Sequence, residues 1–328
     1  MNKAHFLCYI AVIFFLSCKE KKERTAEQSS EKINTISVLI DDQLWKGEIG
    51  DSIRNKFASP VIGLPQEEPL FTINQYPVKL LEGYRTTSRN IIVIKKDPKS
   101  KFEITKNEFA TPQNIFRISG RTGVEIIDTL EKHSTQIIRM IKKSEIIENQ
   151  RIIDTALINS KRITKKFHVK INVPKGYNYV IVRKKFIWLK KEIPSGSQSL
   201  LIYQIPIKNI TKGANSSIIK NIIKTRDSIG NLYIHGRGKN TRMITEAAYS
   251  PYFSITKLDD KKTFESKGTW ELKNDFMSGP FINYCIIDSP RKRILVLEGF
   301  CYAPSKEKRD LMFELEAIIK TVNFKLKQ

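Results

Sequence analysis

Cys18 is the residue whose position predicts the most specific chemistry. An apolar run from Phe6 to Leu16 follows the basic residue Lys3, and Ser17 then precedes the cysteine. A basic start and a short apolar core are typical of a secretory signal, whereas a membrane span needs about twenty apolar residues. The spacing therefore predicts cleavage before Cys18 and acylation of its sulfur and its new amino group.

Two alternatives to this interpretation stay open. The residues before Cys18 depart from the usual lipidation pattern, because Phe15 stands three residues before the cysteine where Leu is preferred. An ordinary secretory signal cut nearby is one alternative, and an uncleaved membrane anchor is the other. If Cys18 is lipidated, we expect an outer-membrane lipoprotein of the cell envelope. The sequence does not decide whether it lies on the periplasmic or the surface face of that membrane.

Carboxylates and histidines are the other residue types that could do chemistry. Glu67, Glu68 and Asp275 are candidates for the acid and base of a hydrolase, which needs two carboxyls about 5 to 9 Å apart across a cleft. The sequence has no HExxH, Cys-x-x-Cys, Gly-x-Ser-x-Gly or phosphate-binding loop motif. His133 and His168 lack ligand spacing. We therefore expect neither a metal nor a cofactor.

A set of aromatic residues suggests a binding groove instead. Aromatic side chains offer flat apolar area for a sugar or a peptide, and a Gly-Pro pair would shape the rim. Packing in the core is the alternative for all of them. The predicted groove consists of Trp188, Trp270, Gly279, Pro280, Phe281 and Tyr302.

A short glycine-containing segment is the second candidate binding element. In His235-Gly236-Arg237-Gly238 the glycines could let backbone amides approach an anion beside Arg237 and His235. A plain hairpin turn is the alternative.

The composition is strongly basic. The chain of 328 residues carries 57 Lys and Arg against 34 Asp and Glu, a formal charge of +23. The lysines are dispersed, and no nucleic-acid-binding motif accompanies them, so we expect no nucleic acid as partner. Attraction to anionic lipid headgroups or envelope glycans fits this charge better, with solubility as the alternative.

Cys285 and Cys301 are expected to stay free. A hairpin of 281–287 and 294–302 would place Cys285 opposite position 296, so Cys301 would lie about 16 Å away along the strand. A disulfide requires Cα atoms within about 7 Å.

The elements expected between these residues predict an α+β fold. Strands in sequence, joined by short turns and packed by a few helices, favour mainly antiparallel sheets. Apolar residues at helical spacing predict a helix through Leu44 to Phe57, capped by Asp41-Asp42, one or two helices over 123–161, and a closing helix over 311–319. The predicted strands include 36–40, 90–94, 114–118, 166–173, 179–183, 186–189, 200–205, 263–272, 281–287 and 294–302.

These elements divide the chain into four parts. Residues 1–17 form the signal peptide, and 18–34 form a flexible tether without apolar periodicity. Residues 35–163 form an N-terminal α+β half, and 164–328 form a C-terminal α+β half with the closing helix.

Several short motifs occur along nearly the whole mature chain: Asp41-Asp42-Gln43-Leu44-Trp45 with Gly47 and Gly50-Asp51, Gly63 to Phe71, Lys267 to Glu271, Met277 to Phe281, and Tyr302-Ala303-Pro304 with Lys308-Arg309. Together they resemble a family of bacterial lipoproteins, the domain of unknown function 4837 family. This chain has Lys267 where the family pattern has Arg, and Ser278 where it has Gly. The resemblance implies an envelope lipoprotein without an assigned reaction. In element order the second half is also similar to PsbP and Mog-type proteins, and the first half could follow the same plan.

From these observations we expect a membrane-anchored envelope lipoprotein that binds or assembles rather than catalyses. Its partners would be the membrane, through the lipid anchor, and an envelope protein, a glycan or a peptide as ligand. The alternative function is a glycan- or peptide-hydrolysing envelope enzyme.

The predicted lipid can be tested directly. Metabolic labelling of the native host with a palmitate analogue should tag the wild-type protein, and Cys18→Ala should abolish the tag because the acylated sulfur is gone. Cys8→Ala, which changes a cysteine inside the predicted signal, should leave the tag in place. A tag that survives Cys18→Ala would contradict the lipidation.

Overall fold

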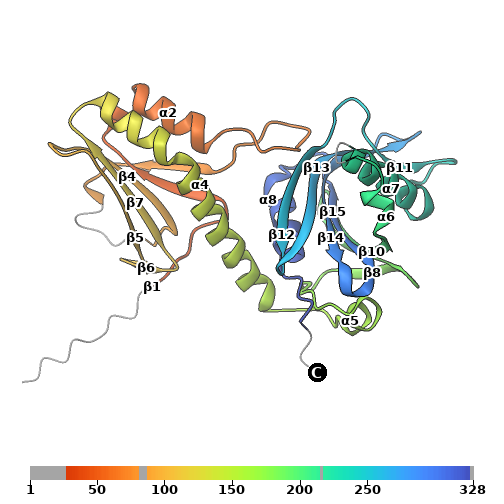
Figure 1. Ribbon diagram of the computed structural model, residues 1–328. Coiled ribbons are helices and arrows are strands. Elements are labelled where there is room, and N and C mark those ends of the chain that lie inside the picture. The colour runs from red at the N-terminus through yellow and green to blue at the C-terminus, as the bar shows by residue number, and fades with distance from the viewer. Residues whose placement is uncertain (1–26, 81–86, 215–216, 326–328) are drawn as a thin grey trace, which may run out of the picture.

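The chain folds into two lobes joined by a long helix, α4 (Figure 1). The computed structural model describes residues 27–80, 87–214 and 217–325. We refer to residues 27–154 as the N-terminal lobe and to 155–325 as the C-terminal lobe. Cys18 and the predicted signal lie outside the described residues. No helix within these ranges is long and apolar enough to cross a membrane.

The N-terminal lobe is built on a five-stranded sheet that is mainly parallel. Strands β3, β2, β4 and β7 lie side by side in that order and run parallel, and β5 is antiparallel at the edge. The strands are β2 (Thr35–Leu39), β3 (Thr72–Tyr76), β4 (Asn90–Lys96), β5 (Lys101–Lys106) and β7 (Asn114–Gly120), with a short pair β1 (Glu27–Gln28) and β6 (Ala110–Thr111) beside them.

Helices cover one face of this sheet. The helix predicted from Asp42 onward is divided at Gly47 into α1 (Asp42–Trp45) and α2 (Glu48–Phe57). Asp41 occupies the position before α1, but its side chain makes no capping hydrogen bond, so the predicted cap is wrong. Ile53 and Phe57 of α2 are fully buried against the sheet.

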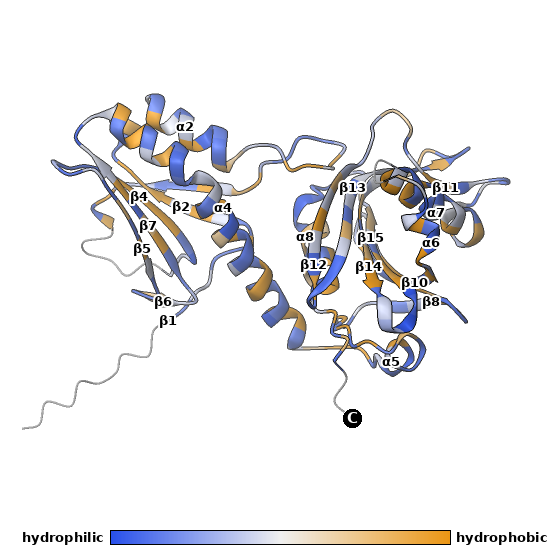
Figure 2. Ribbon diagram, viewed as in Figure 1, coloured by the Kyte–Doolittle hydropathy of each residue, from blue (hydrophilic) through white to orange (hydrophobic). Residues whose placement is uncertain are grey.

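The long amphipathic stretch forms one helix, α4 (Gly123–Asp154), of 32 residues. Thr122 caps its start, because the Thr122 hydroxyl accepts a hydrogen bond from the Glu125 amide. Leu130 and Ile141 pack on the N-terminal sheet, whereas Ile153 near the end of the helix belongs to the core of the C-terminal lobe. The helix therefore shares its apolar side between two cores, as the hydropathy colouring also indicates (Figure 2).

The C-terminal lobe contains an antiparallel sheet with strand order β11-β13-β14-β15-β10-β9-β8, and β12 pairs with β13 beside β11. The strands are β8 (Asn178–Arg183), β9 (Phe186–Ile193), β10 (Gly196–Pro206), β11 (Arg242–Thr245), β12 (Tyr252–Leu258), β13 (Lys261–Lys273), β14 (Ser278–Asp288) and β15 (Arg293–Tyr302).

Helices lie on both faces of the C-terminal sheet (Figure 1). Short α6 (Lys208–Thr211) and α7 (Ile218–Tyr233) cover one face, and α8 (Arg309–Ile319) covers the other. Alternate residues of β14 serve the two cores, because Cys285 packs on the α7 side while Tyr284 packs on the α8 side.

The α+β class is confirmed, and two local predictions are corrected. Residues 166–173 are not a strand: α5 (Lys161–Phe167) ends there, and His168 follows with a left-handed backbone (φ 53°). Ile163 and Phe167 lie in the C-terminal core, so that lobe begins before the predicted boundary after residue 163. The two sheets differ in topology, one mainly parallel and one antiparallel, so the lobes are not two copies of one plan.

The cysteine prediction is confirmed. Cys285 pairs with Val296 across β14 and β15, and Cys285 and Cys301 are free and buried. Burial raises the pKa of the Cys285 thiol and raises that of the Cys301 thiol to about 12.

A buried ionic cluster fixes α4 to the N-terminal sheet. The Glu145 carboxylate, fully buried, accepts hydrogen bonds from Arg89 Nε at 2.6 Å, from Asn90 Nδ2 at 2.6 Å and from the Asn34 amide at 2.8 Å. The Asn34 side chain continues the cluster into the C-terminal lobe, because its Nδ2 donates to Asp310 of α8 at 2.9 Å.

We predict that Arg89→Met lowers the free energy of unfolding by about 3 to 5 kcal/mol, because it leaves the Glu145 charge buried without its cation. Urea denaturation of the two proteins measures the difference. Arg121→Met, which removes an exposed partner of Glu125, is the control and should cost less than about 1 kcal/mol. Equal losses in both variants would contradict the importance of the buried pair.

Candidate functional site

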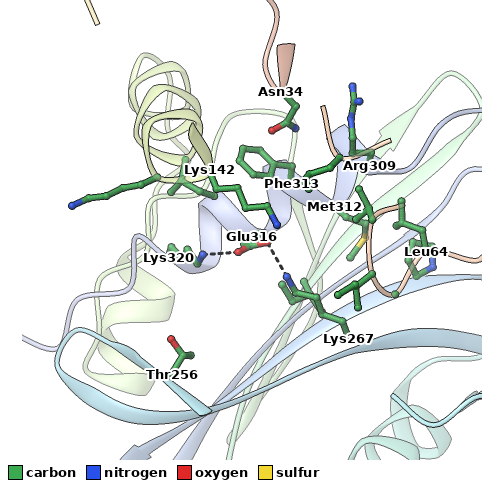
Figure 3. A pocket seen from close by; sticks show the side chains of 18 of the residues that line it. Asn34, Leu64, Lys142, Thr256, Lys267, Arg309, Met312, Phe313, Glu316 and Lys320 are labelled. Atoms are coloured by element: carbon green, nitrogen blue, oxygen red, sulfur yellow. Dashed lines mark hydrogen bonds and ion pairs between the residues drawn. The ribbon is translucent and has the colours of Figure 1, made fainter. Parts of the chain in front are cut away.

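The candidate site is a pocket between the lobes, with a volume of about 570 Å³. The N-terminal lobe lines it with Asn34, the loop 59–71 and the second half of α4, and the C-terminal lobe with the end of β12, residues of β13 and β14, and α8 (Figure 3). The pocket exists only because the two lobes face each other.

The loop 59–71 is held against the C-terminal lobe by a close backbone approach. Gly63 has a positive φ of 87°, and a Cβ there would lie 2.9 Å from the Cβ of Lys267 in β13. Any side chain at this position would therefore be strained and would separate the loop from the strand. This explains a glycine in the motif that begins at residue 63.

The same loop supplies the cap of α8. The Glu68 carboxylate accepts hydrogen bonds from the amides of Lys308 and Arg309, each at 2.7 Å. These amides are the unsatisfied donors at the start of α8, and a carboxylate there also complements the helix dipole. Glu68 is buried, so this candidate acid of a hydrolase has a structural role across the lobe interface.

Arg309 connects the loop to α8 from the other side. Its guanidinium donates to the Pro69 carbonyl at 3.0 Å and to the Thr72 hydroxyl at 3.2 Å, and it pairs with Asp310 at 2.9 Å. Its side chain also borders the pocket (Figure 3). The wall of the pocket on this side is therefore fixed by hydrogen bonds from both lobes.

A cluster of cations surrounds one carboxylate inside the pocket. Glu316 of α8 pairs with Lys267 at 3.3 Å and with Lys320 at 2.5 Å, as the dashed lines in Figure 3 show. Burial raises the pKa of the Glu316 carboxyl, but Lys267 and Lys320 outweigh it and lower that pKa to about 2. Burial acts against the charge of Lys267, but Glu316 and Glu265 prevail and raise its pKa.

Lys142 of α4 is the unpaired cation of this cluster. Within the described residues it has no hydrogen-bond or ion-pair partner, and its side chain lines the pocket. The surrounding protein lowers the pKa of Lys142 by desolvation, and repulsion from Lys267 lowers it further. The negative charge of an anion in the pocket would offset both effects by stabilising the ammonium form of Lys142.

The lining as a whole is basic and partly apolar. Seven basic side chains face two acidic ones: Arg139, Lys142, Lys143, Lys257, Lys267, Arg309 and Lys320 against Asp259 and Glu316. Leu64, Ile146 and Met312 add apolar surface. Ile62 and Ile147 also line the pocket and remain 55% and 54% exposed. An exposed apolar wall beside unpaired cations suits a ligand that is anionic and partly apolar.

The predicted aromatic groove is not formed by its aromatic side chains. Trp270 is buried in the core, where it stacks edge-on against Phe300 and donates from Nε1 to the Cys301 carbonyl at 3.2 Å. Trp188, Phe281 and Tyr302 pack in the same core on the α7 side of the sheet. Core packing therefore explains this set. Gly279 is buried beside Trp270, and only Pro280 and Phe281 of the set line the pocket.

The predicted anion contact lies in a loop whose polar groups are already engaged. The Thr241 carbonyl lies 2.7 Å from His235 Nδ1, and the Thr241 hydroxyl accepts from the Gly236 amide at 2.9 Å. Arg237 is exposed on this loop. The glycine amide therefore serves the turn, and it is not free for an anion.

The candidate carboxylates of an enzyme do not converge. Glu68 caps α8, Glu67 is exposed beside it, and Asp275 follows β13 next to Gly236 on the other side of the lobe. His133 stacks on Phe102 of β5. Among the described residues no group of acidic, histidine or cysteine side chains could hold a metal ion.

Two family models match the chain, and they meet where α4 ends. The model of the domain of unknown function 4837 matches residues 156–321, about half of the chain. The chain belongs to this family. A second domain of unknown function, numbered 8532, matches residues 29–154, so the motifs before residue 72 lie in that part and not in the first family as expected. No curated protein matches the chain.

Four of the five motifs that carry the family resemblance contribute residues to the pocket or its walls, and the motif at 41–51 does not. Gly63 contacts Lys267, Glu68 binds the amides of Lys308 and Arg309, and Pro280 lines the pocket. Segments far apart in the sequence therefore build one interface.

Sequence reasoning missed the basic residues of α4. Arg139, Lys142 and Lys143 stand at helical spacing i, i+3 and i+4, so they share one side of a helix that the sequence did predict. This spacing could have indicated that one side of the helix is cationic. Nothing in the sequence indicated that β12 and α8 would face it.

The charge cluster predicts a pH-dependent stability. Because the pKa of Glu316 is lowered from 4.5 to about 2, its pairing stabilises the fold above pH 4.5, and this contribution is lost as the pH falls towards 2. Glu316→Gln should lower the free energy of unfolding by roughly 3 kcal/mol at pH 7, and this difference should vanish near pH 2. Denaturation at several pH values measures it. Glu131→Gln, at an exposed pair with Lys56, should change little. A difference that persists at pH 2 would contradict the charge effect.

Proposed function

We propose that this protein is a lipid-anchored binding protein of the cell envelope, and that the pocket between its lobes holds an anionic, partly apolar ligand. The lipid anchor rests on the spacing around Cys18 in the sequence. The membership in a family of unknown function assigns no reaction and is compatible with a binding role.

The observation that carries the proposal is the unpaired Lys142 in a basic, partly apolar pocket. Lys267 and Lys320 are neutralised in part by Glu316, whereas Lys142, Arg139, Lys143 and Lys257 have no ion-pair partner within the described residues. Cations in a concave site focus a positive potential that attracts and orients an anion. The adjoining exposed isoleucines would contribute free energy by burying apolar area.

The chemistry of the pocket favours binding over hydrolysis. Glu316 is held between two ammonium groups with its pKa lowered to about 2, so it stays ionised and is a poor general acid or base near neutral pH. The hydrolase alternative would need a second carboxyl beside it, and the other acidic lining residue, Asp259, uses its Oδ2 to accept from the Phe324 amide at 2.7 Å.

A fluorescent anionic amphiphile tests the proposal. A dansyl-labelled undecanoic acid should bind the purified full-length chain saturably, with enhanced fluorescence, and its methyl ester should bind about tenfold more weakly because it lacks the charge. Lys142→Glu should weaken binding of the acid by about tenfold or more and leave binding of the ester nearly unchanged.

Lys224→Glu is the matched control, because Lys224 lies on α7, away from the lobe interface, and the variant makes the same change of charge. It should bind the acid as the wild type does. Equal affinities for acid and ester, or an equal effect of both substitutions, would show that binding is unspecific and would remove the proposal.

A further inference from the structure

Strand β12 has an open edge beside the pocket. Along its whole length, from Tyr252 paired with Lys267 to Leu258 paired with Lys261, β12 is joined to β13. Within the described chain no strand lies on its other side. Its outer backbone groups are therefore a template for another extended chain.

The edge has little of the usual protection against pairing. Edge strands are commonly blunted by proline, by a bulge or by charged side chains, especially lysine. In β12 the register of seven residues is continuous, Pro251 precedes the strand without interrupting it, and Lys257 is the single charged side chain. Tyr252 and Ile255 are large, apolar in part and 59% and 58% exposed, one on each face of the strand. Such side chains give an added strand apolar neighbours on both faces.

The open edge leads into the basic pocket. Thr256, Lys257 and Leu258 at the end of β12 line the pocket together with α4 (Figures 1 and 3). A strand added about 4.8 Å from β12 would lie on the side of the pocket that the basic residues of α4 border. Every second side chain of that strand would face the same way, so alternating carboxylates could meet Arg139, Lys142 and Lys143.

We propose that the ligand is an extended acidic segment of a partner protein, which adds as a strand to β12 and directs its carboxylates into the pocket. This inference rests on the proposed function and names the class of its ligand. Main-chain hydrogen bonds to β12 would supply affinity, and the cations of α4 would select acidic over basic sequences.

The probe is a capped heptapeptide of alternating valine and glutamate, compared with one in which lysine replaces glutamate. The acidic peptide should bind the full-length protein, and the basic peptide should bind at least about tenfold more weakly. Hydrogen exchange of the segment Tyr252–Leu258 should slow when the acidic peptide is present. Lys257→Glu should weaken binding, whereas Lys224→Glu should not.

Two N-methylated forms of the acidic peptide test the strand itself. A strand at a sheet edge uses the amide of every second residue, so methylation of one alternate set should abolish binding, and methylation of the other set should preserve it. This pattern does not depend on charge. A ligand held only by its carboxylates would tolerate both modifications.

The outcomes separate this inference from the proposed function. If both methylated peptides bind like the parent, or if the acidic and basic peptides bind equally, strand addition by an acidic segment is wrong. The same holds if the dansyl acid binds while no peptide does, or if β12 pairs with a second copy of the chain and sedimentation shows a dimer that excludes the peptide. If neither the dansyl acid nor the peptide binds, the proposed function fails as well.

Discussion

The buried Glu145 carboxylate is the constraint on which the arrangement of the two lobes depends. It lies in the second half of α4, and Arg89, Asn90 and the Asn34 amide satisfy it. Removing a charge from water costs several kcal/mol unless hydrogen bonds and an opposite charge replace the solvent. This requirement fixes the rotation of α4 on the N-terminal sheet. Through Asn34 and Asp310 it also sets the position of α8.

The interface between the lobes is polar where it is fixed and open where a ligand could enter. Glu68 and Arg309 hold the loop 59–71 to α8 by hydrogen bonds whose donors and acceptors come from both lobes. Hydrogen bonds depend steeply on distance and angle, so they define the geometry of the pocket more narrowly than apolar contacts would. The second half of α4 then faces β12 and α8 across the pocket, and its cations have room for an outside partner.

The aromatic residues and the cations illustrate opposite errors of sequence reasoning. Trp270 and Phe281 were predicted to bind a ligand because aromatic residues occur both in cores and in binding sites. The structure places their side chains in the core. No binding role was predicted for Lys142, because lysine is common in this chain. Its side chain nevertheless lines the pocket. The identity of a residue does not distinguish these roles, because burial and neighbours decide whether a side chain meets protein or solvent.

The sequence by itself determined the α+β class, the hairpin that keeps Cys285 and Cys301 apart, and the long α4, because apolar periodicity and turn residues act over short distances along the chain. The prediction of lipidation at Cys18 also comes from the sequence alone, because it depends on the spacing between the apolar run and the cysteine. Only the tertiary structure decided that the N-terminal sheet is mainly parallel, that Glu68 caps α8, and that α4 and β12 border one pocket. These features join residues up to 241 positions apart. No local pattern specifies such pairs, because they form only when packing of the whole chain brings complementary groups together.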